Sequence, residues 1–117
     1  VTGVVSDSLT PADLFALASA LHPSAAVCGT PRDTAKKVIS DLEGMNRGRY
    51  AGPAGWIDSR GEGELGIALR CAQINPDNQK QIRLFAGCGI VAGSDPKKEF
   101  AESQAKLLPI REALESY

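Results

Sequence analysis

The sequence predicts an α+β fold in which an antiparallel β-meander is flanked by helices. Apolar residues recur at helical spacing in two early segments, alternate with a period of two in the middle of the chain, and return to helical spacing at the end. The three predicted strands follow one another through short turns, which favours antiparallel pairing. The expected element order is α, α, β, β, β, α, and at 117 residues we expect one domain, residues 1–117, with one core.

Start and stop signals predict the two early helices. At residues 10–13 a Thr cap, a Pro at the first helical position and an Asp three residues after the cap predict the first helix, which Pro23 ends. Residues 30–33 repeat the same start signal, and Gly44 is the expected stop. The second helix is expected to bury one apolar stripe, made of Ala35, Val38, Ile39 and Leu42.

Strand patterns occupy the middle of the chain. Residues 50–58 predict a strand whose Gly and Pro content favours an edge or a bulge, and residues 58–61 predict a turn. Residues 64–74 alternate as a second strand, and a turn at 75–78 leads to a third strand over 81–87.

A last helix is expected to start near residues 94–96 and to run toward Tyr117, with Pro109 kinking or interrupting it.

Composition narrows the classes of function. A net charge of −1 lacks the basic face that nucleic-acid binding requires, and it gives no attraction to acidic membranes. No apolar run approaches the roughly 18 residues of a membrane helix. We therefore expect a cytoplasmic protein with no nucleic-acid or membrane partner.

The three cysteines, Cys28, Cys71 and Cys88, are expected to be buried and reduced. They are widely spaced and only His22 could join them, so neither a zinc site nor a disulfide framework is indicated. His22 has no acidic or thiol partner nearby in the sequence, and no catalytic triad pattern stands out.

Glu99, Glu102 and Lys106 of the last helix share one face, because they are spaced i, i+3 and i+7. Two carboxylates one turn apart can hold Mg²⁺, which takes one or two carboxylates plus water and substrate oxygens. The same spacing is also typical of a solvated face with a Glu102–Lys106 ion pair, so both interpretations stay open.

Residues 86–93 form a glycine-rich segment between a strand and the last helix. Successive N–H groups could bind an anion there, or the glycines could simply allow a tight exit from the strand. A dinucleotide fingerprint is disfavoured because the helix starts only after the third glycine.

Arg70 lies among Gly66, Ala68 and Ala72, which leave room for a ligand above it. It could grip a carboxylate through its bidentate fork, or it could be an ordinary arginine on a solvent-facing strand. Tyr50 on its own is more typical of packing at a sheet edge.

Five ordered segments together resemble the chorismate-utilising enzymes. Residues 21–32 read LHPSAAVCGTPR, similar to the family's H-P-T-P-A-V-x-G-x-P-[RK]; residues 47–56 read RGRYAGPAGW, similar to R-G-x-Y-[AS]-G. Residues 68–70 match the family's strand arginine, residues 86–90 read AGCGI against A-G-A-G-[IL], and residues 99–106 fit E-[WF]-x-E-x-x-x-K. Within the family, Ala26-Val27 and residues 50–53 look most like isochorismate synthases.

The resemblance implies a fold, a reaction and roles for particular residues. It implies the C-terminal part of the chorismate-binding fold, which is like that of anthranilate synthase component I. It also implies an isomerase that moves the hydroxyl of chorismate from one ring carbon to another. Glu102 would bind Mg²⁺, assisted by Glu99. The implied substrate contacts are Ala26, Val27, Tyr50, Arg70, the N–H groups of Gly87 and Gly89, and Lys106.

The family's general base and general acid are expected before Val1, so no catalytic residue is assigned within the chain, and the chain alone is expected to be inactive. Two alternatives remain: a salicylate or anthranilate synthase of the same family, or a binding module without catalysis. In the latter case the chain would pair with the rest of the enzyme or with itself. Cys88 departs from the family's Ala between the glycines, which puts the fit of the anion cradle in question.

Overall fold

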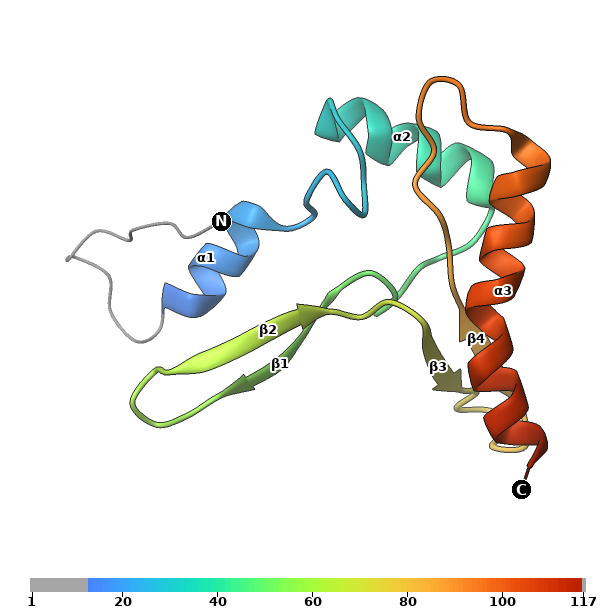
Figure 1. Ribbon diagram of the computed structural model, residues 1–117. Coiled ribbons are helices and arrows are strands. Elements are labelled where there is room, and N and C mark those ends of the chain that lie inside the picture. The colour runs from blue at the N-terminus through green and yellow to red at the C-terminus, as the bar shows by residue number, and fades with distance from the viewer. Residues whose placement is uncertain (1–12, 117) are drawn as a thin grey trace. The chain divides into compact units, whose positions relative to one another are not determined.

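The computed structural model describes residues 13–116, so the predicted Thr10 cap lies outside the described residues (Figure 1). The described chain is α+β, as predicted, with three helices and two antiparallel sheets. It divides into two compact units, one ending at Ile67 and the other beginning at Ala68. The helices and strands are α1 (Asp13–Leu21), α2 (Arg32–Glu43), β1 (Pro53–Ile57), β2 (Gly63–Ile67), β3 (Cys71–Ile74), β4 (Ile82–Phe85) and α3 (Pro96–Glu115).

The ends of both early helices lie close to where their signals place them. α1 ends at Leu21, before Pro23. α2 ends at Glu43 and is capped by Gly44, whose φ of 59° is the left-handed conformation that glycine adopts without strain. The predicted Thr30 cap is wrong. Pro31 holds the cap position, where its carbonyl accepts the first helical hydrogen bond, 2.9 Å from Ala35 N.

The predicted apolar stripe of α2 is not buried. Val38 is 48% exposed and Leu42 is 80% exposed, and α2 has no buried residue. Helical spacing reports which residues share a face, but burial also needs a surface to cover that face, and the described residues cover it only in part: Ala35 and Ile39 are half-buried.

The first unit contains the hairpin of β1 and β2, with Pro53 opposite Ile67 and Ile57 opposite Gly63. Gly55 is required by close approach, because a Cβ there would lie 1.8 Å from the carbonyl oxygen of Glu64. The Cδ2 atom of Leu14 would come within 2.8 Å of a Cβ at Gly63, so α1 packs against this hairpin.

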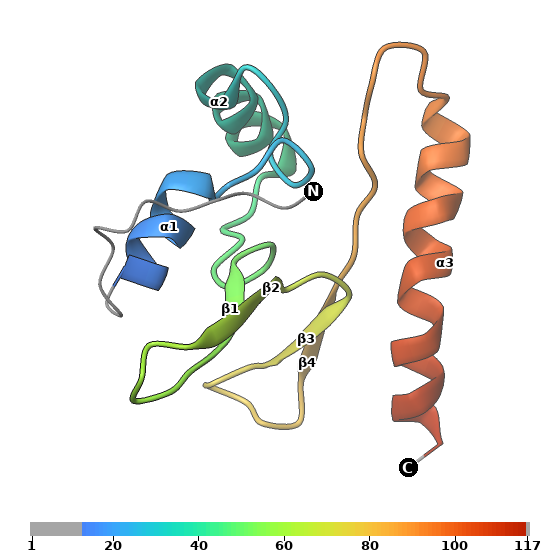
Figure 2. The ribbon, with the colours of Figure 1, turned by 60° about the vertical axis from the view of Figure 1, so that its left-hand side comes forward.

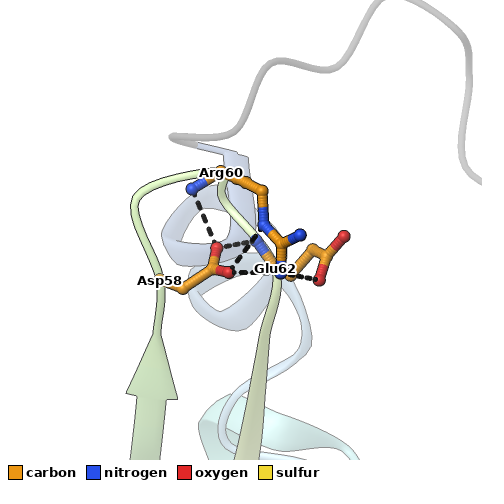
Figure 3. Close-up of polar contacts among 3 residues, drawn as sticks. All are labelled: Asp58, Arg60 and Glu62. Carbon is orange, nitrogen blue, oxygen red and sulfur yellow. Dashed lines mark hydrogen bonds and ion pairs between the residues drawn. The ribbon is translucent and has the colours of Figure 1, made fainter.

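The tip of this hairpin is the predicted turn, and it is held by Asp58 (Figure 3). The Asp58 carboxylate accepts hydrogen bonds from the N–H groups of Arg60 (2.8 Å) and Glu62 (3.0 Å). The Arg60 guanidinium lies 3.0 Å from Asp58 Oδ2 and 3.1 Å from Glu62 Oε2. Desolvation acts to raise the pKa of Asp58, but its hydrogen bonds outweigh that effect and lower the pKa.

The predicted strand over 64–74 is broken in two, which corrects the three-stranded meander. β2 ends at Ile67 and β3 begins at Cys71, and Arg70 between them has a φ of 47°. A left-handed residue cannot continue an extended strand, so β3 pairs with β4 in a sheet of its own. β1 and β4 are also shorter than predicted, and β1 starts late because residues 47–52 form turns that include Ala51 at a φ of 61°.

The last helix begins where predicted. Asp95 Oδ1 accepts hydrogen bonds from the N–H groups of Lys97 (2.9 Å) and Lys98 (3.0 Å). α3 runs from Pro96 to Glu115 with Pro109 inside it, so the proline does not interrupt the helix, which Figure 2 draws as one continuous ribbon. Within the second unit, α3 packs against β4 (Figure 1).

Burial in the described residues is sparse. Within residues 13–116 the buried hydrophobic residues are Ala51 in the first unit and Phe85 in the second, so these residues do not form the single core expected from chain length. All three cysteines are free, as predicted, but they are half-buried rather than buried. None of the described helices is long and apolar enough to cross a bilayer.

Candidate functional site

In the first unit, predicted site residues lie on a short loop and on a turn. The loop after α1 closes one helical turn, with Cys28 N donating to Ser24 O at 3.0 Å and Gly29 N donating to Ala25 O at 2.9 Å. The second segment, residues 47–52, turns back on itself, with Tyr50 N donating to Arg47 O at 2.8 Å. Ala26 and Val27 lie on the loop, and Tyr50 lies on the turn.

Arg47 joins these two segments to the end of α2. Its Nη1 donates to the Val27 carbonyl oxygen at 3.0 Å, and its Nε donates to Glu43 Oε2 at 2.7 Å. Its Nη2 also contacts Glu43 Oε1, and the guanidinium carbon stands 5.5 Å from the centre of the Tyr50 ring. The hydrogen bond with Glu43 raises the pKa of Arg47 against the opposing effect of desolvation.

These contacts border a depression of about 650 Å³ within the first unit. Val27 and Tyr50 line it, together with His22, Lys36 and Arg47. Ala26 is exposed on the neighbouring turn and is not among the lining residues. The first unit thus places two of its three predicted substrate-contacting residues around one concave surface that carries cationic side chains.

In the second unit, the glycine-rich segment lies along α3. Lys106 Nζ donates to the Gly87 carbonyl oxygen at 3.0 Å and pairs with Glu102 Oε1 at 2.6 Å. The Cys88 thiol donates to the main-chain oxygen of Glu99 at 3.4 Å. The structure therefore brings Gly87, Glu102 and Lys106 together, and the predicted Glu102–Lys106 ion pair is present.

Gly89 is exposed, and a Cβ built on it would meet nothing within 4 Å. Open space next to main-chain N–H groups is what an anion cradle requires, although a tight strand exit requires it as well.

The two helix carboxylates suit a hydrated metal ion better than a closed protein cage. Glu102 is 54% exposed at its side chain and Glu99 is half-buried. No cluster of three or more His, Cys, Asp or Glu residues able to hold a metal occurs within residues 13–116. Mg²⁺ commonly binds through one or two carboxylates and completes its shell with water and substrate oxygens, so this pair fits Mg²⁺ with a ligand present.

Arg70 does not stand in the middle of a strand, as the sequence pattern predicts. It is exposed in the break between β2 and β3, and it makes no hydrogen bond or ion pair with other described residues. Its guanidinium is therefore available to a ligand.

Arg47 is the residue that sequence reasoning missed. It lies in the second family-like segment, but Tyr50 alone was singled out there. An available signal was the segment itself, because Arg47 is the first residue of the match to R-G-x-Y-[AS]-G.

Comparison with known proteins identifies relatives along nearly the whole chain. The family model for "Chorismate binding enzyme" matches residues 1–115. The chain is 44% identical over 113 residues to isochorismate synthase MenF of Bacillus subtilis, which covers 97% of this chain and 23% of the relative. It is 46% identical over 101 residues to the salicylate biosynthesis isochorismate synthase of Pseudomonas aeruginosa, covering 86% of this chain and 21% of that protein.

A third relative, isochorismate synthase EntC of Escherichia coli, is 44% identical over 91 residues, or 78% of this chain and 22% of the relative. The chain thus spans about a quarter of the length of the curated relatives it matches. No solved structure matches. The family model covers nearly every residue and contains all five segments that the sequence analysis singled out, so this chain belongs to the chorismate-binding enzyme family.

Proposed function

We propose that this chain is the C-terminal portion of an isochorismate synthase, a Mg²⁺-dependent isomerase that converts chorismate to isochorismate. The observation that carries the proposal is the 44% identity to a Bacillus subtilis isochorismate synthase over 97% of the chain. The reaction moves a hydroxyl group: water adds at one end of an allylic system while hydroxide leaves from the other. Chorismate carries two carboxylates, so a site for it needs cations and N–H donors.

In the first unit, we assign Tyr50 to the enolpyruvyl carboxylate and Ala26 and Val27 to the pocket wall. The depression lined by Val27 and Tyr50 supports this assignment. In the second unit, we assign Arg70 to a carboxylate of the substrate, because its guanidinium makes no hydrogen bond or ion pair with the described residues. A planar guanidinium can bind a carboxylate through two hydrogen bonds.

The N–H groups of Gly87 and Gly89 and the ammonium of Lys106 are proposed to complete the anion cradle. Lys106 is already fixed beside the glycine segment by its hydrogen bond to Gly87 O. Glu102, with Glu99 assisting, is proposed to hold Mg²⁺. The bound ion would bind the ring carboxylate, which the glutamates would otherwise repel.

The chain is proposed to bind and orient the substrate, while the acid and base come from the rest of the enzyme. No residue of the chain is assigned to proton transfer, and we expect the isolated chain to be inactive. A cytoplasmic location is proposed as well, because the three cysteines are free.

A chimera tests the proposal. Residues 1–115 replace the matching segment of the Bacillus subtilis enzyme, and the products formed from chorismate and Mg²⁺ are separated by chromatography. We expect isochorismate from the chimera and none from the isolated chain. Glu102→Ala in the chimera should lower the rate at least 100-fold, because a metal site with so few protein ligands loses its main carboxylate.

Each other outcome has a definite meaning. Salicylate with pyruvate, or an aminated product, would replace the proposed reaction by that of a related synthase. A folded chimera without turnover would favour an interaction module, and full activity of Glu102→Ala would disprove the metal assignment. Glu112→Ala serves as the matched control, since it removes a carboxylate from the far end of α3.

A further inference from the structure

We propose that Arg47, held by Glu43, is a positioning residue that fixes the Val27 loop and the Tyr50 ring as two walls of one chorismate pocket. This inference rests on the proposed function, because it takes chorismate as the ligand. It goes beyond the proposed function because it gives Arg47 and Glu43 a positioning role without contact to the substrate.

One side chain connects three segments of the first unit. The Arg47 guanidinium contacts Glu43 at the end of α2, the Val27 carbonyl oxygen 20 residues earlier in the chain, and the face of the Tyr50 ring. Arginine is suited to this because its donors lie in one plane, so hydrogen bonds along its edge leave its face free for an aromatic ring.

Glu43 supplies the anchor. Both of its carboxylate oxygens contact Arg47, through Nε and Nη2, so the guanidinium plane cannot rotate without breaking one contact. The two side chains are only 26% and 29% exposed, which protects the pair from solvent screening.

The contacts of Arg47 also define what it does not do. Its Nε, Nη1 and Nη2 atoms all make contacts with protein oxygens, so it is a poor ligand for a substrate carboxylate. Val27 and Tyr50, which it holds, both line the depression of about 650 Å³. Loss of Arg47 should therefore act on binding through the placement of those two residues.

The test uses the full chain and two readouts. The chain has two tyrosines, so a Tyr117→Phe background leaves Tyr50 as the only source of tyrosine ring signals in NMR spectra. The first readout is the position of those signals without ligand, and the second is the dissociation constant for chorismate from titration. The variants are Arg47→Ala, Arg47→Lys and Glu43→Gln.

Two controls separate positioning from general stability. Arg49→Ala removes an exposed guanidinium two residues away, which makes no side-chain hydrogen bond or ion pair among the described residues. Gly55→Ala strains the β1–β2 hairpin without touching the depression.

Arg47→Ala and Glu43→Gln should move the Tyr50 signals and weaken chorismate binding about tenfold, the scale of one lost charge-assisted hydrogen bond. Arg47→Lys should recover only part of each readout, because an ammonium lacks the planar fork. Arg49→Ala and Gly55→Ala should leave both readouts at the wild-type values.

The inference is overturned if the Tyr50 signals of Arg47→Ala match the wild type, or if its chorismate affinity is unchanged. If Arg47→Ala does not fold, Glu43→Gln decides by the same criteria. If the wild-type chain shows no chorismate binding, the proposed function of this chain's pocket fails, and the Tyr50 signals alone then decide whether Arg47 positions the ring.

Discussion

Cys88 lies near Glu99, Glu102 and Lys106 in the second unit, and these groups control the reactivity of its thiol. Its thiol donates to Glu99 O at 3.4 Å. Desolvation, a side-chain hydrogen bond with Glu99 and the negative charges of Glu99 and Glu102 raise the pKa of Cys88, while Lys106 acts in the opposite direction. The thiolate is the nucleophile, so a raised pKa lowers the fraction of reactive cysteine at neutral pH.

We predict that alkylation of Cys88 needs a higher pH than alkylation of an unfolded thiol. In a Cys28→Ser, Cys71→Ser background, the midpoint of the iodoacetamide rate against pH should lie above that of a peptide of residues 86–90. Glu102→Gln should lower this midpoint by removing a negative charge, and Lys106→Ala should raise it further. A midpoint equal to or below the peptide's would contradict the surroundings described for Cys88.

Residue spacing explains which site contacts could be predicted from the sequence. The Glu102–Lys106 pair is four residues apart on one helix, so its contact follows from helical geometry. The Lys106–Gly87 and Arg47–Val27 contacts join residues 19 and 20 positions apart. No local pattern encodes such contacts. The family resemblance indicated Lys106 and Gly87 as site residues, whereas for Arg47 it indicated only a place in the segment that matches R-G-x-Y-[AS]-G.

At the scale of helices and strands, the end of a helix was predictable where a single residue determines it. Gly44 ends α2 through its positive φ, and Asp95 begins α3 by accepting two N–H groups. The break between β2 and β3 was not predictable, because alternation of side-chain types continues through residues 65–71 while Arg70 reverses the sign of φ. Alternation reports side-chain chemistry and does not report backbone conformation.

The close pairing of β1 and β2 depends on Gly55, which the alternation of apolar and polar residues does not indicate. A Cβ at Gly55 would lie 1.8 Å from Glu64 O, which is main chain and cannot move aside without shifting the partner strand. We predict that Gly55→Ala destabilises the chain by about 1–3 kcal/mol, the range typical of overpacking. Urea unfolding followed by Trp56 fluorescence would measure this change, since Trp56 lies on the same strand.

Gly66→Ala is the matched control on the paired strand. There the nearest atom to a new Cβ is Ala54 O at 3.9 Å, an ordinary contact, so stability should be unchanged or slightly raised. If both substitutions changed the free energy of unfolding equally, the backbone entropy of the strands, and not the close approach at Gly55, would determine the stability of the hairpin.

On the scale of the whole molecule, many large apolar side chains of the described residues are exposed. In the first unit, Leu42 is 80% exposed and Leu21 is 69% exposed. In the second unit, Ile90 and Val91 are each 71% exposed, and Phe100 is 66% exposed. Large apolar side chains that are this exposed on a soluble protein can mark a region that another protein surface covers. Since the chain spans about a quarter of its relatives' length, we propose that the remainder of the enzyme covers this surface.

We predict that the isolated chain self-associates in a concentration-dependent manner. Removing apolar surface from water favours association in rough proportion to the area buried. Light scattering across a dilution series should give a mass that rises above that of the monomer, and Leu42→Glu with Phe100→Glu should return it toward the monomer mass. The chimera with the Bacillus subtilis enzyme should not show this rise, because its own segments occupy the exposed faces. A monomer at every concentration would contradict this prediction, because it would mean that these side chains do not drive association.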